Sequence, residues 1–122
     1  MDNFQFKRSD RVAQQIQDII SNIIATKVIV QGLGLATVTK VKTSQNLRFS
    51  RIYLSFMGNS ILPEELIILM NRNVKEYRFH LGKELQIKYV PQIKFYYDNT
   101  FEEMEKISNL INKSKTNETN AD

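Results

Sequence analysis

Residues 88–98, KYVPQIKFYYD, decide the fold expected for the second half of the chain. Apolar and aromatic side chains alternate with polar ones, which predicts a β-strand with one buried face. Pro91 lies inside the run and has no backbone N–H to donate, so this strand is expected at a sheet edge or a bulge. The buried face is expected to hold Leu85, Ile87, Tyr89, Pro91, Ile93, Phe95 and Tyr97.

The first half of the chain predicts a helix followed by a hairpin. Residues 8–27 place apolar side chains at intervals of three and four, the pattern of an amphipathic helix, with Ser9 or Asp10 as its cap. Residues 35–43 and 47–57 are rich in β-branched and alternating residues, and a short polar turn, 44–46, joins them. They are expected to form an antiparallel pair.

Two more helices complete the expected fold. Residues 63–83 predict a helix with Pro63 in its first turn and Gly82 as its stop. Residues 100–112 predict another, which a capping box of Thr100 and Glu103 would start. Its buried stripe is expected to be Phe101, Met104, Ile107 and Leu110 or Ile111.

The expected architecture is a single α+β domain over residues 1–112, with the helices on one face of a small sheet. Residues 113–122 contain almost no apolar side chain, so we expect a disordered tail. No apolar run approaches the length of a membrane span and the N-terminus lacks the apolar segment of a secretory signal, so a soluble cytoplasmic protein is expected.

The composition argues against an enzyme. The chain has no cysteine and one histidine, His80, which excludes thiolate chemistry and leaves no second histidine to share a metal ion. The adjacent pairs Glu64–Glu65 and Glu102–Glu103 fall at predicted helix starts, where they complement the helix dipole. We therefore expect no catalysis, no metal and no cofactor.

The distribution of charge favours a polyanionic partner. The net charge is +4, and residues 38–94 hold ten basic and four acidic residues, whereas residues 98–122 hold three and six. Lysine and arginine side chains on a contiguous surface neutralise phosphates whatever the base sequence. Tyr53 and Tyr96 are aromatic residues that could stack on unpaired bases, although a half-buried strand position is the simpler interpretation. The candidate phosphate contacts are Lys40, Lys42, Arg48 and Arg51 on the hairpin, Arg72, Lys75, Arg78 and Lys83 on the second helix, and Lys88 and Lys94 near the last strand.

Three pieces of the sequence together resemble the bacterial ribosome-binding factor A family. They are RSDRVAQQIQDII (8–20), VTKVKTSQNLRFSRIYLSF (38–56) and YRFHLGKELQIKYVPQIKFYYDNT (77–100). The likeness covers about residues 5–112. The last piece is the most specific, through Arg78, Leu81, Gly82, Pro91, Phe95, Asp98, Asn99 and Thr100.

The resemblance implies a type II KH-like fold, α-β-β-α(-kink-α)-β, with a C-terminal helix. It implies binding to the small (30S) ribosomal subunit and its 16S rRNA during late maturation, help with rRNA end processing, importance in cold growth and no catalytic activity. We expect a monomer. Arg8 and Arg11 join the candidate RNA contacts through the family's N-terminal motif.

The sequence departs from the family pattern where the second helix is expected to bend. A KH domain usually carries a Gly-x-x-Gly loop there, and this family an Ala-x-Gly kink. The present chain has Asn73, Val74 and Lys75 there and no glycine, so a bend is expected from residues 71–73, where asparagine tolerates left-handed geometry. A second departure is Val30-Gln31-Gly32 before the first strand, where the family has an Asp-Pro-Arg-like turn. Two other functions stay open, a generic single-stranded RNA-binding module and a protein–protein adaptor with an acidic partner.

Overall fold

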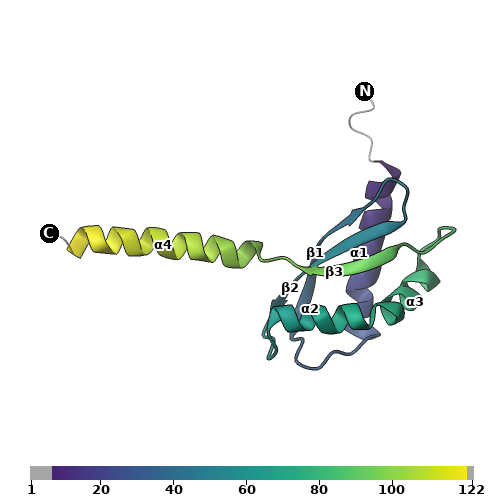
Figure 1. Ribbon diagram of the computed structural model, residues 1–122, viewed down its shortest axis with the longest axis horizontal. Helices are drawn as coiled ribbons and strands as arrows, with labels where there is room; N and C mark the ends of the chain where they lie inside the picture. The colour runs from purple at the N-terminus through teal and green to yellow at the C-terminus, as the bar shows by residue number, and fades with distance from the viewer. Residues whose placement is uncertain (1–6, 121–122) are drawn as a thin grey trace.

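The computed structural model describes residues 7–120, with side chains described through residue 112. A three-stranded sheet and three helices form the body, and a fourth helix leads away from it (Figure 1). The elements are α1 (Arg8–Thr26), β1 (Leu35–Thr43), β2 (Phe49–Met57), α2 (Pro63–Arg72), α3 (Val74–Glu84), β3 (Gln92–Tyr97) and α4 (Thr100–Asn120). The order confirms the expected α+β fold with a divided second helix.

The sheet has the order β1-β2-β3 and mixes both kinds of pairing. β1 and β2 form the expected antiparallel hairpin, with an irregularity between Val38 and Lys40. β3 pairs with β2 in parallel, from Phe49 opposite Gln92 to Leu54 opposite Tyr97. A parallel pair needs a long crossover, which α2 and α3 supply. The parallel pairing brings the starts of β2 and β3 to the same end of the sheet.

One hydrophobic core lies between the helices and the inner face of the sheet. Ile52 and Leu54 of β2 and Phe95 of β3 are fully buried against it, and the Phe95 ring meets Tyr77 of α3 edge-on at 4.9 Å. Burial raises the pKa of the Tyr77 hydroxyl to about 12, so this ring stays neutral in the core at physiological pH. The helices contribute Val12, Ile16, Ile20, Ile23, Ile24, Leu66, Met70, Tyr77 and Leu81.

β3 lies at the sheet edge, as Pro91 predicted, but it is shorter than the sequence pattern suggested. Pro91 is buried immediately before the strand, so its missing N–H removes no hydrogen bond between β3 and β2. The first bond to the neighbouring segment runs from the Gln92 N–H to the Arg48 carbonyl at 2.8 Å. Residues 85–91 form a loop instead of continuing the strand. Tyr89, expected on the buried face, is therefore 70% exposed.

The free edge of β3 is covered by one side chain of α2. The Asn71 amide Nδ2 donates to the Phe95 carbonyl at 3.0 Å, and the Phe95 N–H donates to Asn71 Oδ1 at 2.8 Å. The amide therefore takes the place of a neighbouring strand at this residue. Two residues later the helix breaks at Asn73, which has φ −101° and ψ 20°. The expected bend exists without glycine, and in right-handed rather than left-handed geometry.

The helix ends differ from expectation in three places. α1 starts after Lys7, whose carbonyl accepts the N–H groups of Asp10 and Arg11, and Ser9 is buried rather than capping. Gly82 does not stop α3, which continues to Glu84. At α4, the expected capping box gives way to a different arrangement: Asp98 Oδ1 accepts both the N–H and the hydroxyl of Thr100, at 3.0 and 2.5 Å, and Glu103 N–H donates to the Asn99 carbonyl.

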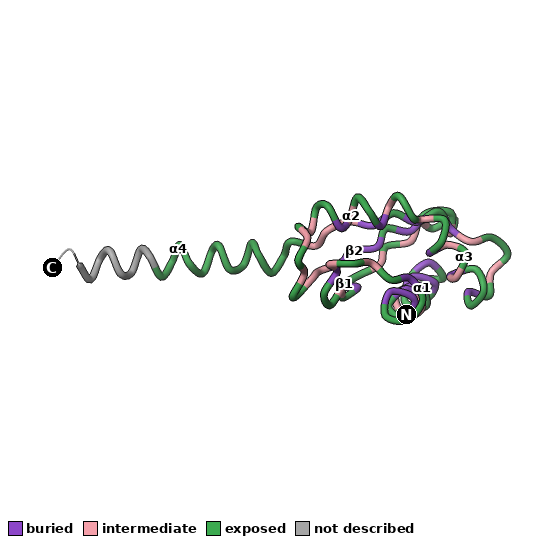
Figure 2. The backbone as a smooth tube through the Cα atoms, turned by 90° about the horizontal axis from the view of Figure 1, so that it is seen from below, coloured by how far each residue is buried: buried purple, intermediate pink, exposed green. Residues whose placement is uncertain are grey.

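The predicted burial of the α4 stripe is wrong. Figure 2 shows α4 exposed from its first turn, and the stripe residues are between 50% and 68% exposed. The inner face of the sheet is already covered by α1, α2 and α3, so no apolar surface is left for α4 there. The exposed stripe consists of Phe101, Met104, Ile107, Leu110 and Ile111.

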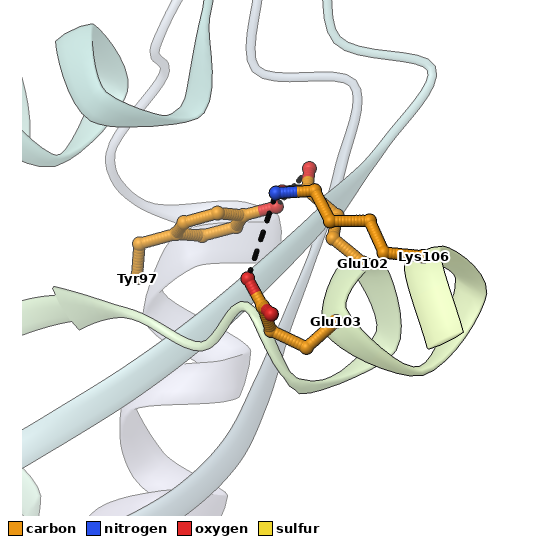
Figure 3. A network of polar contacts seen from close by, with 4 residues as sticks. All are labelled: Tyr97, Glu102, Glu103 and Lys106. Atoms are coloured by element: carbon orange, nitrogen blue, oxygen red, sulfur yellow. Dashed lines mark hydrogen bonds and ion pairs between the residues drawn. The ribbon is translucent and has the colours of Figure 1, made fainter. Parts of the chain in front are cut away.

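Polar contacts fix the start of α4. Its first turn is anchored where the Tyr97 hydroxyl donates to Glu102 Oε1 at 2.5 Å, and Lys106 pairs with Glu103 at 3.6 Å within the helix (Figure 3). α4 extends to Asn120. The disordered tail expected over residues 113–122 stays a prediction. Within the described range, no helix is long and apolar enough to cross a membrane.

Replacing Asn71 with alanine tests whether its amide holds β3 and the helix break together. We expect Asn71→Ala to lower the free energy of unfolding by about 1–3 kcal/mol, because two half-buried backbone groups of Phe95 lose their partners. Asn22→Ala, at an exposed position of α1, is the matched control and should be near neutral. Chemical denaturation measures both, and equal stability of the two variants would contradict the role of Asn71.

Candidate nucleic-acid interface

The side of the sheet that faces away from the core carries cations and aromatic rings in adjacent rows. Lys42 of β1, Arg51 of β2 and Lys94 of β3 lie opposite one another in the strand register. The next row consists of Lys40, Tyr53 and Tyr96. All four cations are exposed. We call this surface the open face; it comprises Lys40, Lys42, Phe49, Arg51, Tyr53, Lys94 and Tyr96.

The two tyrosines of the open face stack on each other. Their ring centroids are 5.4 Å apart with an interplanar angle of 26°, and both residues are half-buried. Lys40 Nζ lies 4.5 Å from the Tyr53 ring centre and Lys94 Nζ lies 5.4 Å from that of Tyr96, distances typical of cation–π contacts. The stacked pair and its lysines form one platform that combines aromatic surface with positive charge, the two features that bind a base and a phosphate.

No described carboxylate lies within ion-pair distance of the cations of the sheet. Among the described residues, the one ion pair is Lys106–Glu103 on α4, away from the sheet. That pair is exposed and contributes little to stability. The positive charge of the open face is therefore available to an external anion.

Asp98 is the carboxylate nearest the open face, and it is held by hydroxyl groups. Its Oδ2 accepts the Thr39 hydroxyl at 2.6 Å, and its Oδ1 accepts the N–H and hydroxyl of Thr100. These hydrogen bonds, Thr100 first and then Thr39, lower the pKa of Asp98 below its ordinary value, and the charge of Lys40 adds to the effect. Asp98 thus ties the start of α4 to the irregular position of β1.

A hollow of about 510 Å³ lies at the end of the sheet where β2 and β3 begin. It brings together three predicted contacts from separate segments: Arg8 at the start of α1, Arg48 in the β1–β2 turn and Lys88 in the α3–β3 loop. Phe49 lines the hollow and also a second depression that contains Lys42 and Arg51. The hollow therefore borders the open face at Phe49.

The predicted contacts on the second helix form a separate group. Arg72, Lys75 and Lys83 are exposed on α2 and α3, in the helical layer on the other side of the core from the open face. Arg78 differs from them because its Nε and Nη2 donate to the carbonyls of Pro91 and Val90, both at 3.0 Å. Its guanidinium holds the α3–β3 loop.

The structure thus divides the predicted residues rather than gathering them into one patch. Lys40, Lys42 and Arg51 share the open face, and Arg8, Arg48 and Lys88 share the hollow. Arg11 is exposed one turn after Arg8 on α1 but does not line the hollow. Sequence reasoning did not propose Phe49 and Tyr89 as part of a binding surface, because both were counted as ordinary strand residues. The sequence does carry a signal for both, because each ring directly follows a cation: Phe49 follows Arg48 and Tyr89 follows Lys88.

Fold and surface together define a KH-like α+β domain with a basic and aromatic exposed side. Solved structures of that fold are similar: the crystal structure of ribosome-binding factor A from Thermus thermophilus aligns with a TM-score of 0.65 at 16% identity, over 73% of this chain and 93% of that one. A Thermotoga maritima protein, a putative ribosome-binding factor A solved by NMR, aligns with a TM-score of 0.57 at 22% identity, over 70% and 82%.

The chain belongs to the ribosome-binding factor A family, whose model matches residues 8–111. Curated relatives include the ribosome-binding factor A proteins of Vibrio campbellii, 31% identical over 89% of this chain and 82% of that protein, and of Geobacter metallireducens, 30% identical over 87% and 90%. Thermus thermophilus ribosome-binding factor A, as fitted into the cryo-EM map of a 30S complex, aligns with a TM-score of 0.62 at 16% identity, over 74% of this chain and 94% of that one.

The lowered pKa of Asp98 predicts a specific dependence of stability on pH. A carboxyl group whose pKa is depressed by folding stabilises the fold above its unfolded pKa, here the ordinary 3.8, and loses that contribution as the pH falls through the depressed value. We expect Asp98→Asn to be less stable than the unaltered protein at pH 7, with a difference that shrinks below pH 3.8. Denaturation across pH measures this, and Thr39→Val should reduce the effect. A difference that is constant with pH would contradict it.

Proposed function

We propose that this protein is an assembly factor that binds the small (30S) ribosomal subunit and its 16S rRNA. The observation that carries the proposal is the open face, where four exposed cations surround a stacked tyrosine pair. Membership of the ribosome-binding factor A family supports the target, as does the relative of the same fold that was fitted into a 30S complex.

In this proposal the protein acts in late maturation, assists processing of the rRNA ends and does so without turnover. It acts as a monomer in the cytoplasm and is most needed in the cold. The physical basis is docking by charge and shape, because exposed lysines and arginines bind phosphates regardless of base sequence and the rigid sheet fixes their spacing. The binding domain in this proposal is residues 1–112.

A generic single-stranded RNA-binding module is the second candidate, and the Tyr53–Tyr96 platform is the feature that favours it. A gradient profile separates the two functions. A subunit-specific factor peaks with free small subunits in a cell extract, whereas a generic binder spreads over all RNA-containing fractions.

Removing charge separately from the open face and from the helices α2 and α3 tests which of these two surfaces contacts the subunit. We expect Lys40→Gln, Lys42→Gln and Arg51→Gln, combined, to weaken binding to purified small subunits and to reduce the slope of log K against log salt by about one per lost phosphate contact. Co-sedimentation over a salt series is the measurement.

The matched comparison combines Arg72→Gln, Lys75→Gln and Lys83→Gln, which removes the same number of charges from the helical layer. Arg78 is left intact because its loss would release the α3–β3 loop. A loss of binding confined to the helical-layer variant would move the interface to α2 and α3 and contradict the assignment to the open face.

A further inference from the structure

The hollow at the start of β2 and β3 has the chemistry of a site for an anion with a flat apolar part. Its cations are Arg8, Arg48 and Lys88, and none of the described residues that line it is acidic. Three cations from three segments, with no carboxylate among them, favour a phosphate group.

Aromatic and aliphatic side chains form the rest of the wall. Phe49 is 59% exposed and Tyr89 is 70% exposed, so both rings are accessible from the hollow. Leu47, Ile87 and Val90 add apolar surface. A single-stranded nucleic acid offers both features in each nucleotide, a base that stacks on aromatic rings and a phosphate that pairs with cations.

The wall on the α3–β3 side is held in place by residues outside the hollow. Arg78 donates to the carbonyls of Val90 and Pro91 and so fixes the loop that carries Lys88 and Tyr89. Gly82 permits this packing, since a Cβ there would lie 3.0 Å from Val90 Cγ2. The rings and cations of this side are therefore pre-positioned, which lowers the entropic cost of binding.

The hairpin side is fixed as tightly. The Ser44 hydroxyl accepts the N–H groups of Arg48 and Phe49 at 3.2 and 3.1 Å and donates to Asn46 Oδ1 at 2.7 Å. Leu47 has φ 62°, a left-handed conformation that non-glycine residues rarely adopt, and these hydrogen bonds stabilise it. The turn thus presents Arg48 and Phe49 in one defined orientation.

We propose that the hollow binds one unpaired nucleotide of an RNA strand, with its base against Phe49 and Tyr89 and its phosphate between Arg8, Arg48 and Lys88. The inference rests on the RNA-binding function proposed above and specifies the form of RNA. A duplex keeps its bases stacked inside, where they cannot reach the two rings. Because Phe49 also lines the depression that contains Lys42 and Arg51, the next nucleotides of the strand would meet the open face, which a free nucleotide would not use.

Fluorescence of 2-aminopurine in a short RNA tests this with the full chain, because the base analogue responds to stacking. The probes are a single strand with one 2-aminopurine, a hairpin in which the analogue is paired and the loop is a non-nucleotide linker, and adenosine monophosphate as a competitor of the labelled strand. We expect the single strand to bind at least about tenfold more tightly than either other probe. Tyr89→Ala and Phe49→Ala should each weaken strand binding about tenfold.

Phe79→Ala is the matched control, because Phe79 is also 59% exposed but lies on α3 and does not line the hollow. It should bind the strand like the unaltered protein. Lys88→Gln should reduce the salt slope by about one, and Lys27→Gln, at an exposed lysine elsewhere, should not. Circular dichroism confirms the fold of each variant, and Tyr89, on an exposed loop, is the substitution least able to disturb it.

The results distinguish failure of this site from failure of the proposed function. Three results would overturn the hollow as a site for an unpaired nucleotide. The first is strand binding that neither ring substitution affects, and the second is strand binding that Phe79→Ala weakens equally. The third is binding of the paired hairpin or of adenosine monophosphate as tight as that of the single strand. Co-sedimentation with small subunits would then still test the proposed function alone. Conversely, ring-dependent strand binding without co-sedimentation would support the hollow and contradict the ribosomal target.

Discussion

The edge strand β3 makes backbone hydrogen bonds on both of its sides, with β2 on one and with the Asn71 amide on the other. This double attachment fixes the parallel strand without a fourth strand and determines where α2 must end. The helix break at Asn73 follows two residues after the amide that covers the edge. The same attachment sets the register that aligns Lys94 with Arg51 and Tyr96 with Tyr53. The open face therefore depends on one side-chain amide of the helical layer.

The parallel direction of β3 has a second consequence, because it places the loop before β3 beside the hairpin turn. A strand that ran the other way would carry the Lys88–Tyr89 loop to the opposite end of the sheet, away from Arg48. In the sequence, Arg78 looks like a phosphate contact and Pro91 like an irregularity within a strand. In the structure the two act together. β3 begins only after Pro91, and Arg78 holds the loop that precedes the strand. The hollow is thus a product of topology more than of local sequence.

Local patterns predicted the elements well and their surroundings less well. The alternation in β2 and β3 and the three- and four-residue spacing in α1 arise from burial of one side, so they predicted both the element and its buried face. The stripe of α4 has the same spacing, yet Phe101 and Met104 are exposed, because periodicity records that a helix is amphipathic and not what covers it. Nor does spacing along the chain show that Lys42 and Arg72 lie on different sides of the core. That separation follows from alternation in the strand and packing of the helix, which involve residues distant in sequence.

The junction between α2 and α3 bears on how a KH-like domain without a Gly-x-x-Gly loop can bind RNA. In a KH domain that loop clamps the backbone of the strand. Here one residue, Asn73, separates the helices, and its N–H donates back to α2 while its carbonyl accepts the Glu76 N–H. This one-residue junction lacks the glycine-bounded loop with which a KH domain clamps the strand. In the function proposed here, side-chain cations and rings of the open face and the hollow take over the role of that loop, away from the α2–α3 junction.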